Sequence, residues 1–216
     1  MVSTTAPTRL GNILAEPPRP ARRAIALPPE TGRSSHVLTT GQSVFQADIP
    51  DRYRRWRLED YRPATVRAVR AWLADASAWS LLIHGAPGTW KSSLAAATVT
   101  ACRAGGVRSM FAAPESARSR LREFAEWWTT QAHEVAVLAL DDLGAGRDTP
   151  FVHEAVCSIL RHRYDRGAKT ILTANVDAGG LATWDPRIAD RLREGVVLFA
   201  GGESRRGPTA NGARPR

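Results

Sequence analysis

A glycine-rich loop at residues 85–92 is the part of the chain best suited to bind phosphate. Its residues are, in order, Gly85, Ala86, Pro87, Gly88, Thr89, Trp90, Lys91 and Ser92. In loops of this pattern the backbone N–H groups surround the phosphates, the lysine contacts the β and γ oxygens, and the serine hydroxyl binds Mg²⁺. Ser93 follows at a helix N-terminus, whose partial positive charge favours an anion. The loop therefore predicts a binding site for a nucleoside triphosphate and Mg²⁺.

Trp90 departs from this pattern, because it stands where the second glycine is expected. Glycine at that position allows the backbone to approach the phosphate closely. A bulky aromatic side chain is therefore expected to cost about 1–3 kcal/mol in backbone strain and to crowd the nucleotide. Two interpretations stay open: an active nucleotide hydrolase, and a degenerate loop in a protein that no longer hydrolyses its nucleotide.

Two adjacent carboxylates, Asp141 and Asp142, follow an apolar run at residues 135–140. Such an uninterrupted run is typical of a strand buried in a parallel sheet. A carboxylate at the end of this strand reaches Mg²⁺, and a second orients or deprotonates the attacking water. We assign Asp141 to the metal together with Ser92, and Asp142 to the water. An aspartate pair alone is also a common turn or helix cap, so the assignment depends on the loop at residues 85–92.

Strands and helices alternate along the middle of the chain. Apolar runs predict strands at residues 80–84, 107–112, 135–140, 170–174 and 196–199. Helical spacing, N-caps and prolines predict helices at residues 63–75, from Ser92 onward, and at 115–129, 149–166 and 187–193. This alternation predicts an α/β fold with a parallel central sheet.

The two ends of the chain differ in composition from its middle. The 216 residues carry a formal net charge of +9 at pH 7, which favours an anionic partner such as nucleic acid. Residues 1–47 are rich in proline, arginine, serine and threonine and are expected to form a flexible, basic arm. We expect residues 48–206 to form the folded core and residues 207–216 a disordered tail.

The sequence shows no membrane or targeting segment. No apolar run is long enough to span a bilayer, and proline and arginine interrupt the N-terminal apolar stretches. The two cysteines, Cys102 and Cys157, lie in apolar surroundings without metal-ligand spacing. We expect both to be buried free thiols in a reducing cytosol, and hence a cytoplasmic protein.

Five blocks of the sequence resemble the DnaC/IstB-type AAA+ ATPases. The blocks are residues 49–53 with 58–61, 85–92, 140–144, 170–175 and 185–195. A closing segment from Phe199 to Arg206 is similar to the family's last strand, so the resemblance covers roughly residues 49–206. It implies a P-loop NTPase of the ASCE/AAA+ class with a three-layer fold, and ATP and Mg²⁺ as cofactors. Only ten residues follow Arg206, so we expect no full C-terminal lid.

The resemblance also implies roles for polar residues outside the loop. Asn175 takes the place of sensor 1, which contacts the γ-phosphate or the attacking water, although an asparagine after a strand is also a common turn former. Arg191 takes the place of the arginine finger that acts in trans on a neighbouring subunit, with Arg187 as a second candidate. Arg206 takes the sensor 2 position, with Arg205 as the alternative. A finger in trans implies a homo-oligomer.

The helix predicted at residues 115–129 lies where helicase loaders and replication initiators carry an element that faces single-stranded DNA. Its arginines, together with Trp127 and Trp128, supply charge and stacking surface for a single strand. The same pattern fits an ordinary amphipathic helix with Trp128 in the core.

Three functions fit these features. The leading hypothesis is a replicative helicase loader, an ATP-regulated adaptor that binds a helicase through the basic arm and places it on single-stranded DNA. The alternative is an IstB-like helper ATPase that acts on duplex DNA with a transposase. The third is a non-hydrolysing adaptor with a degenerate P-loop.

Overall fold

The computed structural model describes residues 24–27, 49–112, 129–144 and 149–202. Its strands are β1 (Ser80–His84), β2 (Ser109–Ala112), β3 (Val137–Leu143), β4 (Lys169–Ala174) and β5 (Val196–Phe199). Its helices are α2 (Asp51–Arg54), α3 (Pro63–Ala74), α4 (Lys91–Ala104), α6 (Pro150–Asp165) and α7 (Pro186–Leu192). Two 3-10 turns, η1 (Leu58–Asp60) and η2 (Gly180–Thr183), complete these elements.

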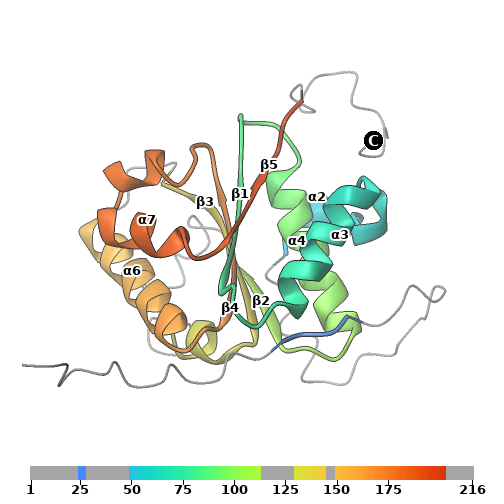
Figure 1. Ribbon diagram of the computed structural model, residues 1–216, viewed down its shortest axis with the longest axis horizontal. Helices are drawn as coiled ribbons and strands as arrows, with labels where there is room; N and C mark the ends of the chain where they lie inside the picture. The colour runs from blue at the N-terminus through green and yellow to red at the C-terminus, as the bar shows by residue number, and fades with distance from the viewer. Residues whose placement is uncertain (1–23, 28–48, 113–128, 145–148, 203–216) are drawn as a thin grey trace, which may run out of the picture.

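The strands form one five-stranded sheet in the order β2-β3-β4-β1-β5. Every neighbouring pair is parallel. Figure 1 shows α2, α3 and α4 on one side of the sheet and α6 and α7 on the other. The α/β class and the parallel three-layer arrangement predicted from the sequence are therefore confirmed.

Most elements lie within two residues of their predicted positions, and β3 differs in an informative way. It begins at Val137 and continues through both aspartates to Leu143, whereas the apolar run predicted a strand that ends at residue 140. Of the helix predicted at residues 115–129, the part before residue 129 lies outside the described residues, and residues 129–134 are helical. The tail at 207–216 and the arm at 1–47, apart from residues 24–27, also lie outside them.

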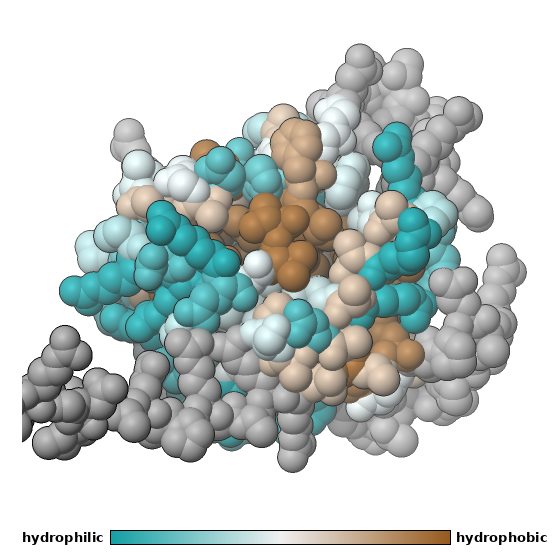
Figure 2. All heavy atoms as spheres, in the orientation of Figure 1, coloured by the Kyte–Doolittle hydropathy of each residue, from teal (hydrophilic) through white to brown (hydrophobic). Residues whose placement is uncertain are grey.

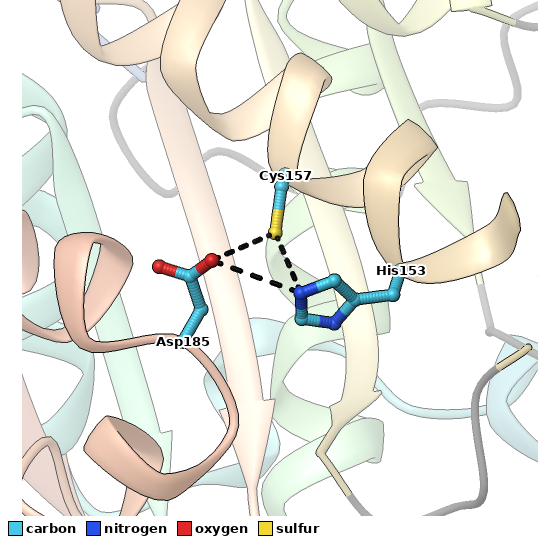
Figure 3. Close-up of side chains that lie close together, drawn as sticks. All are labelled: His153, Cys157 and Asp185. Carbon is cyan, nitrogen blue, oxygen red and sulfur yellow. Dashed lines mark hydrogen bonds and ion pairs between the residues drawn. The ribbon is translucent and has the colours of Figure 1, made fainter. Parts of the chain in front are cut away.

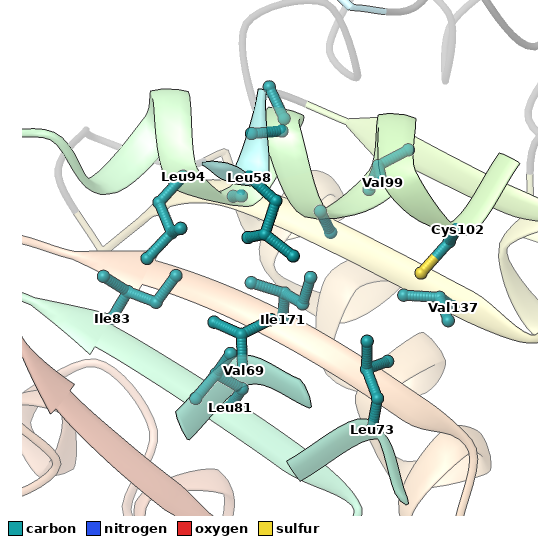
Figure 4. Packing of buried hydrophobic residues seen from close by; sticks show 14 of the residues in the cluster. Leu58, Val69, Leu73, Leu81, Ile83, Leu94, Val99, Cys102, Val137 and Ile171 are labelled. Carbon is teal, nitrogen blue, oxygen red and sulfur yellow. The ribbon is translucent and has the colours of Figure 1, made fainter. Parts of the chain in front are cut away.

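Side chains alternate between the two faces of the sheet, as expected for strands that are covered on both sides. Leu81 and Ile83 of β1 pack in the cluster on the α3–α4 side, whereas Leu82 between them packs in the cluster on the α6 side. Figure 4 shows the first cluster, in which helix residues cover the strands: Val69, Leu73, Leu94, Val99 and Cys102. The sheet is thus fixed between two hydrophobic layers.

Both cysteines are buried and free, as predicted. Cys102 belongs to the cluster on the α3–α4 side and Cys157 to the cluster on the α6 side. Burial raises the pKa of each thiol to about 12. Neither thiol is therefore an ionised nucleophile at neutral pH.

The edge strand β5 is less covered than the other strands. Val197 is 46% and Phe199 is 69% exposed. Figure 2 shows hydrophobic residues in the middle of the visible face, where β5 runs in Figure 1. This apolar surface is formed by the strand β5. In the described ranges, no helix is long and apolar enough to cross a bilayer.

Lys169, the first residue of β4, connects this central strand to the end of α3. Its side chain is buried. The Nζ atom donates to the carbonyl oxygens of Trp72 at 2.7 Å, of Ala78 at 2.6 Å, and of Asp75. Carbonyl groups at and just after the end of a helix carry partial negative charge, which stabilises the buried ammonium group.

Arg163 of α6 holds the same end of β4 from the other side of the sheet. It is wholly buried and donates at 2.7–2.9 Å to four oxygens: Ala132 O, Val135 O, Lys169 O and Thr170 Oγ1. These partners are neutral, so carbonyl and hydroxyl dipoles offset the charge. Burial lowers the pKa of Arg163 to about 9, which leaves the guanidinium charged at neutral pH.

We expect Arg163→Met to lower the free energy of unfolding by about 3–5 kcal/mol, because several buried acceptors lose their donor at about 1 kcal/mol or more each. Denaturant unfolding measures this change. The matched control is Arg161→Met on the same helix, whose side chain is 37% exposed and pairs with Glu154 at 2.6 Å. An exposed pair contributes at most about 1 kcal/mol, so equal losses in the two variants would contradict the role of Arg163.

Candidate functional site

The predicted phosphate-binding loop joins the end of β1 to the start of α4. Two of its glycines have positive φ angles, 150° at Gly85 and 85° at Gly88. A Cβ atom on Gly85 would lie 2.3 Å from the carbonyl oxygen of Ala200, so this position has no room for a side chain. The loop leads directly into the N-terminus of α4, as phosphate binding requires.

The ammonium group of Lys91 lies inside this loop. Lys91 is 4% exposed. Its Nζ donates to the carbonyl oxygens of Gly85 at 2.9 Å and Ala86 at 2.7 Å and lies 3.5 Å from Thr89 Oγ1. The Thr89 hydroxyl in turn donates to Ala86 O at 3.0 Å. A phosphate entering the loop would therefore meet a positive charge that is already in place.

Trp90 does not strain the loop, so the predicted backbone cost is wrong. Its φ and ψ are −86° and 14°, the conformation of the third residue of a type I turn, which most residue types adopt. The ring is half-buried, packs against the cluster on the α3–α4 side, and lies edge-on to Tyr61 with 6.0 Å between ring centroids. Among non-glycine residues in the described ranges, only Asp142 has a positive φ. The predicted crowding of the nucleotide by Trp90 stays a prediction.

Asp141 and Ser92, the two candidates for metal binding, lie next to each other. Asp141 is 5% exposed, and its carboxylate accepts a hydrogen bond from the Thr173 hydroxyl at 2.6 Å. Burial raises the pKa of Asp141, whereas the nearby hydroxyls of Thr173 and Ser92 lower it by less. A buried carboxylate that ionises unfavourably is a group that a cation stabilises. Carboxylate and hydroxyl oxygens are also ligands that suit Mg²⁺, so the residues fit this ion.

Thr173 of β4 connects the two aspartates, and sequence reasoning did not identify it as a site residue. Its buried Oγ1 donates to Asp141 Oδ1 at 2.6 Å and accepts the backbone N–H of Asp142 at 2.7 Å. A hydroxyl carries a single proton, and here that proton goes to the Asp141 carboxylate. The only sequence feature that could have indicated Thr173 is its place as a polar residue in an apolar strand, two residues before Asn175.

Asp142 and Asn175 meet at the carboxyl ends of β3 and β4. Asn175 Nδ2 donates to Asp142 Oδ1 at 3.2 Å. Asp142 has a φ of 62°, and the pairing of β3 with β4 shifts between Leu140 and Leu143. Such a left-handed backbone is uncommon for a residue with a side chain and is often found at functional sites. It leaves the Asp142 side chain exposed beside that of Asn175.

Arg52 of α2 is a second residue that the sequence left without a role. Burial is the main influence on the Asp141 carboxyl and raises its pKa, whereas the positive charge of Arg52 lowers it. The Arg52 guanidinium also lies 4.7 Å from the centroid of the Tyr53 ring. The block at residues 49–53 therefore brings a cation near the carboxylate predicted to bind metal.

Arg191, the predicted finger, does not belong to this cluster. It lies on α7, on the opposite side of the sheet from α4 (Figure 1). Its guanidinium is half-buried over the ring of Tyr164, 5.0 Å from the centroid. Arg187 on the same helix is exposed, and Arg205 and Arg206 lie outside the described residues. The action of Arg191 on a neighbouring subunit stays a prediction.

Comparison with known proteins identifies the fold. No family model and no curated protein matches the sequence. The DnaC helicase loader superposes with a TM-score of 0.61 at 22% identity, over 70% of this chain and 100% of that chain. DnaI superposes with 0.62 at 24% identity, over 73% of this chain and 94% of that chain.

The replication initiator DnaA, solved with AMPPCP and single-stranded DNA, gives a TM-score of 0.61 at 17% identity. The match covers 72% of this chain and 51% of DnaA, so the chain spans about half of that protein. These likenesses show that the chain has the AAA+ fold found in helicase loaders and DnaA, as the sequence motifs predicted.

In the nucleotide-free protein, we expect Asp141→Asn to raise the melting temperature at neutral pH. The pKa of Asp141 is raised above its ordinary value of 3.8, so the folded chain binds this proton more tightly than the unfolded chain does. Stability therefore falls as the pH rises from 3.8 through the raised pKa, and ionised Asp141 is destabilising above it. Asparagine removes this cost, with a gain of about 2–4 °C for each kcal/mol.

Thermal unfolding between pH 4 and 8, with and without Mg²⁺ and ATP, tests this expectation. The stabilising effect should grow with pH, and Mg²⁺ with ATP should stabilise the wild-type chain more than the variant. Asp142→Asn is the control, because its side chain is exposed and asparagine tolerates the left-handed backbone. The expectation is wrong if both variants shift the melting temperature equally.

Proposed function

We propose that the chain is an AAA+ ATPase that binds ATP with Mg²⁺ and hydrolyses ATP at the carboxyl edge of its sheet. The observation that carries this proposal is the network around Thr173, which brings Asp141 and Asp142 together beside Ser92 and Asn175. Candidates for phosphate, metal and water binding thus lie at one place. DnaA, a protein of the same fold, was solved with the ATP analogue AMPPCP, which supports ATP as the nucleotide.

In this proposal each group has a separate task. Lys91 and the backbone N–H groups of residues 85–93 hold the phosphates, and Ser92 with Asp141 holds Mg²⁺. Asp142 orients the attacking water and accepts its proton, while Asn175 fixes the Asp142 carboxylate and faces the γ-phosphate. Bound Mg²⁺ neutralises charge on the phosphate oxygens. Arg206 is proposed to contact the nucleotide as sensor 2.

Arg191 completes the site from a neighbouring subunit in this proposal. Its position on α7, across the sheet from α4, favours action on the nucleotide of another chain over action on its own. A guanidinium is always charged and donates in a fixed plane, which suits the charge that develops during phosphoryl transfer. The active form is therefore a homo-oligomer.

We further propose that this ATPase is a cytoplasmic loader of a replicative helicase onto single-stranded DNA, with ATP as its switch. The likeness to the DnaC helicase loader extends over 100% of that chain and the likeness to DnaI over 94%. The net charge of +9 suits a nucleic-acid partner, and DnaA was solved with single-stranded DNA.

The other two hypotheses differ in support. An IstB-like helper of a transposase depends on the same sequence motifs and is distinguished by its partners. A non-hydrolysing adaptor is no longer supported by backbone strain at Trp90 and now depends on crowding of the nucleotide by the indole ring.

Mixing two inactive variants is expected to restore ATP hydrolysis. Asp142→Asn removes the water-activating group, and Arg191→Lys keeps an aliphatic stem and charge over Tyr164 but loses the planar donor. Each variant alone should hydrolyse ATP at least about 100-fold more slowly than the wild-type chain. In an equal mixture, half of the sites keep Asp142 and half of their neighbours supply Arg191, so about a quarter of the interfaces become competent.

Steady-state phosphate release, with and without single-stranded DNA, measures this recovery. Asp165→Asn is the matched control, because it removes an exposed carboxylate at the end of α6 and should leave the rate unchanged. A mixture no faster than its parents would exclude the action of Arg191 in trans. A Trp90→Gly chain in the same assay tests whether the indole ring crowds the nucleotide. A large gain in the rate of hydrolysis would show that the indole limits it. A wild-type chain without ATP hydrolysis would favour the non-hydrolysing adaptor.

The loader proposal predicts ATP-dependent capture of the host's replicative helicase. The Asp142→Asn chain, held in its ATP state, should retain the helicase at least about tenfold better with ATP than with ADP, a coupling typical of nucleotide switches. Affinity capture with the full chain, followed by size-exclusion chromatography, measures retention, with Asp165→Asn as control. Retention of a transposase on duplex DNA in place of the helicase would support the IstB-like role.

A further inference from the structure

Three side chains at the junction of α6 and α7 each bring one potential metal ligand to a common point (Figure 3). His153 and Cys157 lie one helical turn apart on α6, and Asp185 is the N-cap of α7. The sequence around Cys157 showed no metal-ligand spacing, because Asp185 is 28 residues away along the chain. Folding alone brings the three groups together.

The distances between the three ligand atoms match a tetrahedral metal site. Cys157 Sγ lies 3.6 Å from His153 Nε2 and 3.4 Å from Asp185 Oδ2, and these nitrogen and oxygen atoms are 3.7 Å apart. Zinc takes sulfur at about 2.3 Å and nitrogen or oxygen at about 2.0–2.2 Å, so the edges of its tetrahedron are about 3.4–3.6 Å long. An ion of this size would require little movement of the side chains.

The same geometry excludes a proton relay of the Cys-His-Asp kind. A relay uses the two ring nitrogens of histidine, one toward the nucleophile and the other toward the carboxylate. Here a single atom, His153 Nε2, faces both Cys157 Sγ and Asp185 Oδ2. Three donor atoms that face one another form a coordination triangle.

Neighbouring groups hold the ligands in this orientation. Asp185 Oδ1 accepts the N–H groups of Arg187 and Ile188 at 2.9 Å each, which leaves Oδ2 directed to the cluster. The His153 ring lies against Trp184, with 4.7 Å between ring centroids. Such outer contacts fix ligand orientation in metal sites. Cys157 is buried, whereas the His153 side chain is 32% exposed, so water has access to a fourth position.

We propose that His153 Nε2, Cys157 Sγ and Asp185 Oδ2 bind a divalent transition-metal ion, Zn²⁺ in the first place, with water as the fourth ligand. One sulfur, one nitrogen and one oxygen suit Zn²⁺ and not Mg²⁺. Binding forms one bond from each side chain to the ion and releases the thiol proton to solvent. The site is distinct from Ser92 and Asp141, and metal binding does not depend on ATP hydrolysis.

The ion would join two helices that already pack in one hydrophobic cluster. It connects the first half of α6 to the N-cap of α7, the helix that carries Arg191. A bound ion would add one link to the packing that Ile188, Ala189 and Leu192 already provide for α7.

The test uses the tag-free, metal-stripped full chain titrated with Co²⁺ and then with Zn²⁺. We expect one equivalent of Co²⁺ with a sulfur-to-cobalt charge-transfer band, its displacement by Zn²⁺, and a rise in melting temperature with Zn²⁺. Excess Mg²⁺ should leave the band in place. Cys157→Ser should abolish the band and weaken Zn²⁺ binding at least about 100-fold, since even outer contacts are worth 10–100-fold.

Two further variants keep the test independent of folding. Asp185→Asn retains a good N-cap for α7 but loses the charged ligand, so we expect weaker Zn²⁺ binding with an unchanged metal-free melting temperature. Cys102→Ser removes the other buried thiol and should bind both ions as the wild-type chain does. The proposal is overturned if the wild-type chain shows no sulfur-to-cobalt band, or if Cys157→Ser and Asp185→Asn bind Zn²⁺ as tightly as Cys102→Ser.

Discussion

The hydroxyl of Thr173, buried between β3 and β4, is the interaction on which the candidate site depends. It donates its only proton to Asp141 and accepts the backbone N–H of Asp142. The first bond holds a buried carboxylate beside Ser92, and the second supports the left-handed backbone that directs Asp142 toward Asn175. One group therefore sets the position of both carboxylates. Thr173 lies on β4, the central strand of the sheet, which is paired with a strand on each side.

The other end of β4 is held by two buried cations, Lys169 and Arg163, that donate to backbone oxygens. Lys169 donates to carbonyl oxygens at the end of α3, and Arg163 donates to carbonyl oxygens at residues 132 and 135 and to the start of β4. Both cations donate to buried backbone oxygens, which need hydrogen-bond partners. The central strand is thus anchored on both faces at its amino end, while its carboxyl end carries the polar residues of the site.

The sequence predicted the elements and the residues with local patterns, and it missed what depends on contacts in space. The phosphate-binding loop, its lysine and the aspartate pair could be identified because their chemistry requires a fixed spacing in the sequence. The strands could be identified because apolar runs are typical of strands that are buried on both faces. Thr173 was missed because a threonine in a strand is ordinary until its neighbours on β3 are known. Trp90 was expected to strain the backbone because the motif has glycine at that position, whereas its φ of −86° suits residues with a side chain. The His153, Cys157 and Asp185 cluster spans two helices and leaves no mark in local spacing.

The close approach of Gly85 to Ala200 has a mechanical consequence. The Ala200 N–H donates to His84 O at 2.7 Å, and its carbonyl oxygen fills the space that a side chain at residue 85 would occupy. The exit of the chain from β5 therefore rests against the first residue of the loop that is proposed to hold the phosphates. Because no gap separates the Ala200 carbonyl from residue 85, the path of the chain after β5 and the shape of the loop depend on each other.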